Sequence, residues 1–109
     1  MDVISISAPE LANWLADANR QPPVLLDVRE LSELQHCQIP ASLHIPMHSV
    51  PPRMNELDSA AAIVCICHHG ARSMQVARFL KQHDFEHVIN LTGGIHAWAV
   101  QVDTTMETY

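Results

Sequence analysis

The sequence predicts an α/β domain built on a mostly parallel sheet, and three observations lead to that prediction. Short apolar runs alternate along the chain with segments whose apolar residues recur at helical spacing. Residues 24–26 form a continuous apolar run, as expected for a strand buried on both faces of a sheet. A second apolar run, residues 61–66, leads through Cys67 into a helical pattern. Strands that alternate with helices in this way are typical of parallel sheets.

The first sixty residues contain three expected strands and two expected helices. Ser7 and Glu10 match a capping box, which marks the start of a helix. Gln-Pro-Pro at residues 21–23 ends that helix, and Pro46 ends the third strand. The expected elements are a strand over residues 3–6, a helix from residue 8, a strand over 24–26 closed by Asp27, a short helix over 30–36, an edge strand over 43–45, and a loop with one or two helical turns over 47–59.

The remaining residues contain two expected strands and two expected helices. Residues 62–66 are expected to form the central strand, residues 73–83 a helix, and residues 88–89 the last strand. A Gly-Gly pair then makes a turn into a short helix over residues 95–100. Residues 101–109 are polar and lack periodicity, so we expect this tail to be frayed.

Length and composition are typical of one domain. The chain has 109 residues, and we expect a single domain over 1–109, with a core over about 3–100 and a tail over 101–109. The formal net charge of −6 and the single lysine argue against nucleic acid or an anionic membrane as a partner. Every apolar segment is shorter than the roughly 20 residues of a membrane-spanning helix.

The N-terminus and the cysteines bear on location. Met1, Asp2 and Val3 begin neither a basic segment nor the long apolar segment of an export signal, so we expect a cytoplasmic protein. The 3 cysteines cannot all pair, and the chain is not dense in cysteine, which fits a reducing compartment.

The segment with the clearest chemical meaning is the loop Cys67, His68, His69, Gly70, Ala71, Arg72 and Ser73. A strand delivers Cys67 into this tight loop, and the loop opens directly into a helix. The first N–H groups of a helix lack partners within it and carry the positive end of its dipole. A thiolate there is stabilised, which lowers a cysteine pKa from about 8.5 towards the ~3.5–7.5 range of reactive cysteines. We therefore expect Cys67 to be a nucleophile, with Gly70 supplying a positive φ or a close approach.

Four segments, in order and spacing, resemble the single-domain rhodaneses, which are sulfurtransferases. Residues 26–30 resemble the Asp-Val-Arg segment after the second strand of that family, and residues 38–46 its His-Ile-Pro-Gly-Ala segment. Residues 67–73 resemble its active-site loop, and residues 91–98 its C-terminal Gly-Gly…Trp signature. The resemblance implies a rhodanese-like fold, with a five-stranded, mostly parallel sheet and helices on both faces. The chain departs from the family pattern at Cys37, Gln38 and Ala41, and at His68, where the family often has arginine.

The resemblance also implies an activity. Cys67 would take a sulfane sulfur from thiosulfate or a persulfide donor, hold it as a persulfide, and pass it to a thiol, to a sulfur-relay protein, or to cyanide in vitro. No cofactor and no metal are implied. One alternative is a persulfide carrier or a regulatory docking module with weak thiosulfate activity. Another is a phosphatase of the same fold, which is disfavoured because those enzymes place one more residue between the cysteine and the arginine than separates Cys67 from Arg72.

The other side chains of the loop have more than one interpretation. Arg72 could pair with the anion of the donor or with a surface carboxylate. Ser73 could give its hydroxyl to the sulfur or cap the helix. His68 and His69 could line the pocket mouth and attract anionic donors when protonated, or lie in solvent. Metal binding by this pair with the nearby cysteines is disfavoured, because adjacent histidines point in different directions.

Two further pairs of residues lie outside the loop. Asp27 and Arg29 follow a strand end, where an internal salt bridge that positions the loops is favoured over a direct catalytic role. Cys65 lies in the middle of the expected central strand and is interpreted as a core residue. Cys37 could act as a resolving thiol for the nucleophile, although the sequence does not establish that the two are close.

Overall fold

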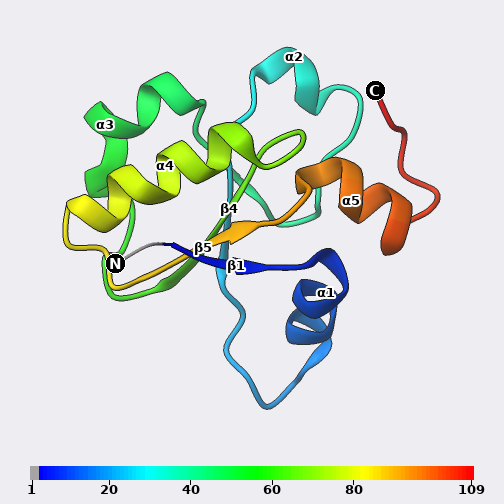
Figure 1. Cartoon of the computed structure of the whole chain (residues 1–109), viewed down its shortest axis with the longest axis horizontal. Coiled ribbons are helices and arrows are strands. Elements are labelled where there is room, and N and C mark those ends of the chain that lie inside the picture. The colour runs from blue at the N-terminus through cyan, green and yellow to red at the C-terminus, as the bar shows by residue number, and fades with distance from the viewer. Residues whose placement is uncertain (1–2) are drawn as a thin grey trace.

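Strands and helices alternate along the chain in the computed structural model, which describes residues 3–109. Met1 and Asp2, on which the expectation about the N-terminus partly rests, lie outside the described residues. The elements, labelled in Figure 1 where there is room, are β1 (Ile4–Ile6), α1 (Ala8–Ala16), β2 (Val24–Asp27), α2 (Leu31–Leu34), β3 (Leu43–His44), the 3-10 turn η1 (Met47–Ser49), α3 (Val50–Arg53), the 3-10 turn η2 (Met54–Glu56), β4 (Ala62–Ile66), α4 (Ala71–Gln82), β5 (His87–Leu91) and α5 (Gly94–Gln101).

The five strands form one sheet in the order β1-β5-β4-β2-β3, and every pairing is parallel. The predicted parallel sheet is therefore confirmed. β4 is the central strand, with Cys65 opposite Leu26 of β2 on one side and opposite Asn90 of β5 on the other. The carboxyl ends of parallel strands meet at one edge of the sheet, where ligands bind in folds of this type. Cys67 follows β4 at that edge.

Alternate residues of β4 face opposite sides of the sheet, and helices cover both sides. Ile63, Cys65 and Cys67 belong to the cluster beneath α4 and α3, whereas Val64 and Ile66 belong to the cluster beneath α1 and α5. In Figure 1, α4 lies above the strands and α1 below them. This confirms the prediction of helices on both faces, and it places Cys65 of β4 and Cys67 just after it on the α4 side.

Local chemistry explains where the helices begin. Before α1, the Glu10 N–H donates to Ser7 Oγ at 3.2 Å and the Ser7 N–H donates to the Glu10 carboxylate at 3.0 Å, which completes the predicted capping box. α4 begins at Ala71, two residues earlier than predicted, because Gly70 takes the N-cap position with a left-handed φ of 110°. Among residues 3–109, no helix is both long enough and apolar enough to cross a membrane.

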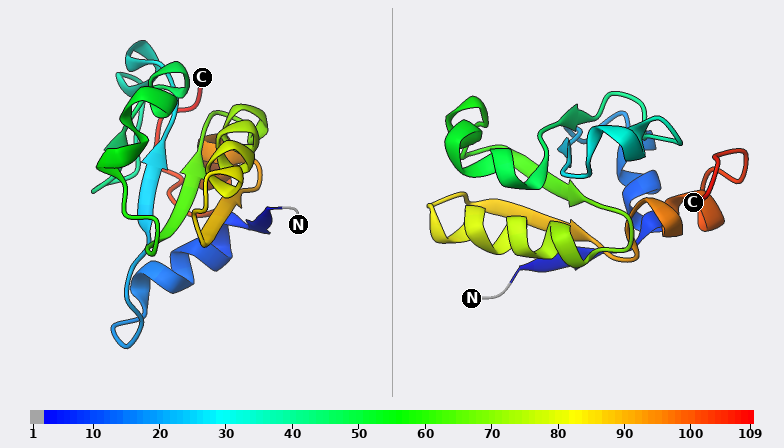
Figure 2. Two further views of the ribbon diagram at one scale, coloured as in Figure 1. Left: turned by 90° about the vertical axis from the view of Figure 1, so that its left-hand side faces the viewer. Right: turned by 90° about the horizontal axis from the view of Figure 1, so that it is seen from above.

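The C-terminal tail differs from the expectation that it is frayed. After α5 the chain turns back, and Figures 1 and 2 show its C-terminal end beside α2. Tyr109 Oη donates to the Glu33 carboxylate at 2.7 Å and accepts from Arg29 Nη1 at 3.0 Å. Its ring stacks on His68, with centroids 3.9 Å apart. Tyr109, together with Glu107 at 3.2 Å from His36 Nδ1 and with Met106 packed on the core, holds this segment. Contacts of this kind leave no helical or strand periodicity in the sequence.

Candidate active site

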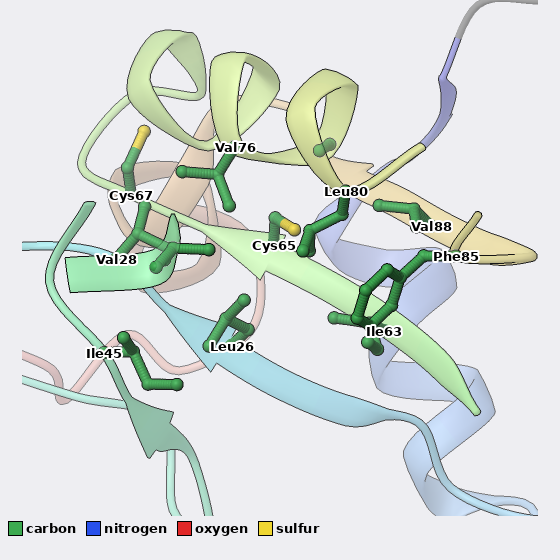
Figure 3. Close-up of a cluster of buried hydrophobic side chains, with 12 residues drawn as sticks. Leu26, Val28, Ile45, Ile63, Cys65, Cys67, Val76, Leu80, Phe85 and Val88 are labelled. Carbon is green, nitrogen blue, oxygen red and sulfur yellow. The ribbon is translucent and has the colours of Figure 1, made fainter. Parts of the chain in front are cut away.

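Cys67 lies where β4 runs into the loop before α4, and its side chain is only 1% exposed. Figure 3 shows its sulfur pointing toward the first turn of α4. The Gly70 N–H donates to Cys67 Sγ at 3.0 Å. The loop therefore brings a helix N-cap amide onto the sulfur, as the sequence predicts, and such a donor stabilises negative charge on that atom.

Ser73 supplies a second polar group beside the sulfur. Its Oγ lies 3.3 Å from Cys67 Sγ, 3.2 Å from the Gly70 carbonyl oxygen and 2.5 Å from Asn90 Oδ1. Because Gly70 is the N-cap and no side chain caps α4, the structure matches the interpretation in which the Ser73 hydroxyl faces the sulfur. Ala71, also predicted for this loop, is exposed and opens α4.

Asn90 is a site residue that the sequence analysis missed. It belongs to β5, is 4% exposed, and donates from Nδ2 to the Gly70 carbonyl oxygen at 3.2 Å while Oδ1 faces Ser73. One signal could have found it, because a strand that extends through residue 90 places Asn90 on the same face as Val88, toward α4. The sequence predicts a last strand over residues 88–89 only, whereas β5 continues to Leu91 and so includes Asn90.

The start of α5 closes the loop from the other side. The Ile95 N–H donates to the Cys67 carbonyl oxygen at 2.8 Å, and the His96 N–H donates to the His68 carbonyl oxygen at 3.1 Å. These bonds require a close approach at Gly94, where a Cβ would overlap both of those carbonyl oxygens. Gly94 also has a φ of 60°. The Gly-Gly segment thus fixes the backbone of Cys67 against a second helix N-terminus.

Arg72 is paired with a carboxylate. Its Nη1 and Nη2 donate to the two oxygens of Glu33 at 2.6 and 2.8 Å, and Tyr109 adds a third hydrogen bond to the same carboxylate. The hydrogen bond from Arg72 is the main cause that lowers the pKa of Glu33 to about 2, so this group is ionised at neutral pH. Of the two interpretations of Arg72, the structure has the one in which a carboxylate of the chain is its partner.

His68 lies beneath Tyr109, with the two rings stacked at an interplanar angle of 6°. Burial, followed by the neighbouring His69, lowers the pKa of His68 below its usual range, which favours the neutral ring at pH 7. Its Nε2 is buried without a hydrogen-bond partner among the described residues. His69 is exposed. Within residues 3–109, no group of three or more His, Cys, Asp or Glu side chains is arranged to hold a metal ion.

Asp27 and Arg29 form the predicted internal salt bridge. Arg29 Nη2 lies 2.8 Å from Asp27 Oδ2, and both residues are fully buried. The same guanidinium donates to the Cys37 carbonyl oxygen at 2.7 Å and to Tyr109 Oη at 3.0 Å. One buried cation therefore connects the end of β2, the segment after α2 and the C-terminal tail, which is the positioning role expected for this pair.

The other two cysteines lie in different surroundings. Cys65 is fully buried, and burial raises the pKa of its thiol to about 12, consistent with a core residue. Cys37 packs with the cluster beneath α1 and α5, whereas Cys67 belongs to the cluster on the opposite face of the sheet. All three cysteines are free thiols. The structure therefore does not bring Cys37 and Cys67 together as a resolving pair.

These features define a class of protein: a parallel α/β domain with one cysteine at the carboxyl edge of its sheet. An amide at the start of α4 donates to the sulfur of this cysteine, and an amide at the start of α5 donates to its carbonyl oxygen. The chain belongs to the family of rhodanese-like domains, whose sequence model matches residues 7–101. It is 39% identical over 97 residues to a sulfurtransferase of Allochromatium vinosum, covering 89% of each chain. It is also 33% identical over 100 residues to the thiosulfate sulfurtransferase GlpE of Pseudomonas savastanoi pv. phaseolicola, covering 91% of this chain and 92% of that protein.

A solved structure agrees with this assignment. The crystal structure of a rhodanese-like domain protein from Staphylococcus aureus superposes with a TM-score of 0.83 at 30% sequence identity. The match covers 98% of this chain and 99% of that chain. The rhodanese-like fold inferred from four sequence segments is therefore confirmed over nearly the whole length.

Proposed function

We propose that this protein is a rhodanese-type sulfurtransferase that moves a sulfane sulfur through a persulfide on Cys67. The observation that carries the proposal is the environment of Cys67 Sγ, which receives the Gly70 N–H at 3.0 Å and lies 3.3 Å from the Ser73 hydroxyl. Relatives that align over about nine-tenths of the chain and are named sulfurtransferases support the same activity.

The reaction divides into two displacements at sulfur. The Cys67 thiolate attacks the outer sulfur of thiosulfate, so that a new S–S bond forms, the S–S bond of thiosulfate breaks, and sulfite leaves with the electron pair. The persulfide anion that results carries one negative charge, as the thiolate did. Cyanide or a thiolate then attacks the terminal sulfur, and the Cys67 thiolate is released together with thiocyanate or a new persulfide.

The loop residues have separate roles in this reaction. The amide of Gly70 and the hydroxyl of Ser73 stabilise the sulfur anion. Ala71 opens the helix whose start faces the sulfur, and His68 and His69 form the adjoining surface of the loop. Because Cys67 is only 1% exposed, the donor must present a narrow terminal sulfur.

Two ion pairs support this loop: Asp27 with Arg29, and Glu33 with Arg72. Asp27 and Arg29 form the buried pair that connects β2 with the segments around the loop. Arg72 is the one arginine among residues 67–73 and could bind an anionic group of the donor, but its guanidinium already donates two hydrogen bonds to Glu33. A dianionic donor must therefore compete with an internal carboxylate for this guanidinium.

The Arg72–Glu33 pair also favours a second candidate function, a persulfide relay. A donor that is itself a protein persulfide brings its sulfur without a sulfonate dianion, so it does not need a free guanidinium in the loop. In that function the partners are a persulfide donor and an acceptor protein or thiol, and thiosulfate is a poor substrate. A reducing location such as the cytoplasm would keep the thiol available in either case.

The test is the intact mass of the protein after incubation with thiosulfate and then with cyanide. We expect a gain of one sulfur atom that maps to Cys67 and disappears as thiocyanate forms. If thiosulfate gives no gain but a glutathione persulfide donor labels Cys67, the relay is supported instead. If neither donor labels Cys67 in the folded protein, the proposed function is wrong.

A further inference from the structure

The buried side chain of Asn90 ends in an amide, and both polar atoms of this amide contact the nucleophile loop, residues 67–73. It comes from β5, and it reaches across to α4 and the loop before it, where Nδ2 donates to the Gly70 carbonyl oxygen and Oδ1 accepts from the Ser73 hydroxyl. A buried primary amide is costly unless its polar atoms have partners. Here the partners belong to Gly70, whose N–H donates to Cys67 Sγ, and to Ser73, whose Oγ lies 3.3 Å from that sulfur.

The orientation of this amide follows from its neighbours. The Gly70 carbonyl oxygen can only accept a hydrogen bond, so the donating Nδ2 must face it and Oδ1 must face Ser73. Oδ1 in turn can only accept, so the Ser73 hydroxyl donates to it, at 2.5 Å. The two hydrogen bonds fix the carbonyl of Gly70 and the hydroxyl oxygen of Ser73 on either side of one rigid group.

This arrangement determines whether the Ser73 hydroxyl directs its proton or a lone pair at Cys67 Sγ. The Ser73 hydroxyl has a single proton, and three acceptors lie within reach of its oxygen. With the proton on Asn90 Oδ1, the oxygen presents a lone pair to Cys67 Sγ and can accept a thiol proton. An anionic sulfur competes with Asn90 Oδ1 for this one proton, and donation to the sulfur gives up the hydrogen bond to Oδ1. Asn90 therefore sets where the Ser73 oxygen lies before the hydroxyl rotates. The Gly70 N–H lies in the preceding peptide group, and it is joined to the anchored Gly70 carbonyl through the Cα of the same residue.

We propose that Asn90 is a positioning residue for sulfur transfer: it anchors the Gly70 carbonyl and the Ser73 oxygen, and so sets the positions of the two residues whose polar groups lie beside Cys67 Sγ. This inference rests on the proposed function, because it concerns the same sulfur. It adds a residue from β5, outside the loop, whose effect on the reaction passes through Gly70 and Ser73. Asn90 itself contacts neither the donor nor Sγ.

The test compares Asn90→Leu, which keeps a similar volume and removes both hydrogen bonds, with Asn90→Asp, which keeps an acceptor and removes the donor. Each variant is mixed with thiosulfate, and the single-turnover rate of persulfide formation on Cys67 is followed by mass. We expect Asn90→Leu to slow this step by up to about tenfold, as for the loss of a neutral hydrogen bond at the upper end of its usual range, while KM for thiosulfate changes little. Asn90→Asp should be at least as slow, because its carboxylate faces the Gly70 carbonyl and a sulfur anion.

Two comparisons separate positioning from general damage to β5. Ile89→Ala, on the opposite face of the same strand, should lower stability and leave the rate of the folded protein unchanged. In the Ser73→Ala background, Asn90→Leu should cost clearly less than in the wild-type background, because the two residues act as one unit.

The inference is overturned if a folded Asn90→Leu protein transfers sulfur at the wild-type rate. If Asn90→Leu does not fold, a wild-type rate for Asn90→Asp overturns it equally. It is also overturned if the loss is fully additive with Ser73→Ala, or if Ile89→Ala slows the reaction as much. These outcomes differ from failure of the proposed function, in which the wild-type protein itself acquires no sulfur on Cys67 from either thiosulfate or a persulfide donor.

Discussion

The guanidinium of Arg72 is held by the carboxylate of Glu33 through two hydrogen bonds of 2.6 and 2.8 Å. The carboxylate comes from α2 and the guanidinium from the first turn of α4, so the pair connects two elements that are distant in sequence. Tyr109 donates a further hydrogen bond to Glu33. An internal anion therefore occupies the one arginine of the nucleophile loop.

This pairing predicts opposite effects of its two members on anionic donors. Arg72→Ala should raise KM for thiosulfate by about tenfold, because the loop then lacks its cation and one charge-assisted hydrogen bond is lost. Glu33→Gln should lower KM for thiosulfate several-fold, because the guanidinium is released. Steady-state kinetics with thiosulfate and with an uncharged persulfide donor measure both effects, and the uncharged donor should respond much less.

A matched control is available on α2. Glu30→Gln removes an exposed carboxylate at the N-cap of the same helix, and it should change KM for thiosulfate far less than Glu33→Gln does. If Arg72→Ala and Glu33→Gln both raise KM for every donor to the same degree, the pair braces the loop and does not regulate donor binding.

The same carboxylate predicts a pH dependence of stability. Its pKa is about 2 in the folded protein, compared with about 4.3 in an unfolded chain. The folded pKa is depressed, so the stabilisation is fully present above the unfolded value and is lost as the pH falls toward 2. The free energy of unfolding of the wild type should exceed that of Glu33→Gln by about 1–2 kcal/mol at pH 7, after allowance for solvent screening.

Urea denaturation of both proteins between pH 7 and pH 2 tests this pH dependence. The difference in unfolding free energy should stay constant down to about pH 4.5 and shrink below it. A difference that stays the same at every pH would mean that packing and the Tyr109 hydrogen bond, rather than the charge of Glu33, account for it.

The three cysteines should respond differently to removal of the thiol. Cys67→Ser should abolish persulfide formation and leave the melting temperature close to that of the wild type. Cys37→Ala should retain transfer, because this residue lies on the other face of the sheet. Cys65→Ala should retain transfer at a cost of about 1 kcal/mol in stability, because a small buried side chain is truncated. Mass mapping and thermal denaturation of each variant provide the measurements.

Tyr109 is predicted to stabilise the fold in two separable ways. Tyr109→Phe keeps the ring between His36 and His68 but removes the hydrogen bonds with Arg29 and Glu33, at an expected cost of about 1 kcal/mol. Tyr109→Ala also removes the stacking and should cost more.

Chemical denaturation of the two Tyr109 variants measures these costs. Thr104→Ala, an exposed change in the same tail, serves as the control and should be neutral. Equal stability of wild type, Tyr109→Phe and Tyr109→Ala would mean that Tyr109 contributes nothing to the free energy of unfolding.

The fold could be predicted because its signals are local and repeated. The capping box at Ser7 and Glu10, the apolar run that ends at Asp27, and the strand that ends before Cys67 each specify an element from a few adjacent residues. Their alternation then leaves a parallel sheet as the simplest arrangement. The position of Cys67 could be predicted for the same reason, since the strand, loop and helix around it are contiguous.

The rest of the site could not be predicted because it depends on contacts between distant segments. Glu33 meets Arg72 across 39 positions of sequence, and Tyr109 meets Glu33 across 76. Asn90 looks like a polar interruption of a strand until its register against β4 is known. No periodic pattern marks such residues, because their partners are a few side chains and carbonyls from distant segments rather than a face of one element.

The close approach at Gly94 has a consequence for inherited variation. Any single-nucleotide change that replaces this glycine adds a Cβ where the carbonyl oxygens of Cys67 and His68 already lie. The new atom would displace the peptide groups of Cys67 and His68. Even alanine, the smallest replacement, would therefore disturb the loop. The start of α5 is therefore constrained by the backbone around Cys67, although no side chain at this position takes part in the loop.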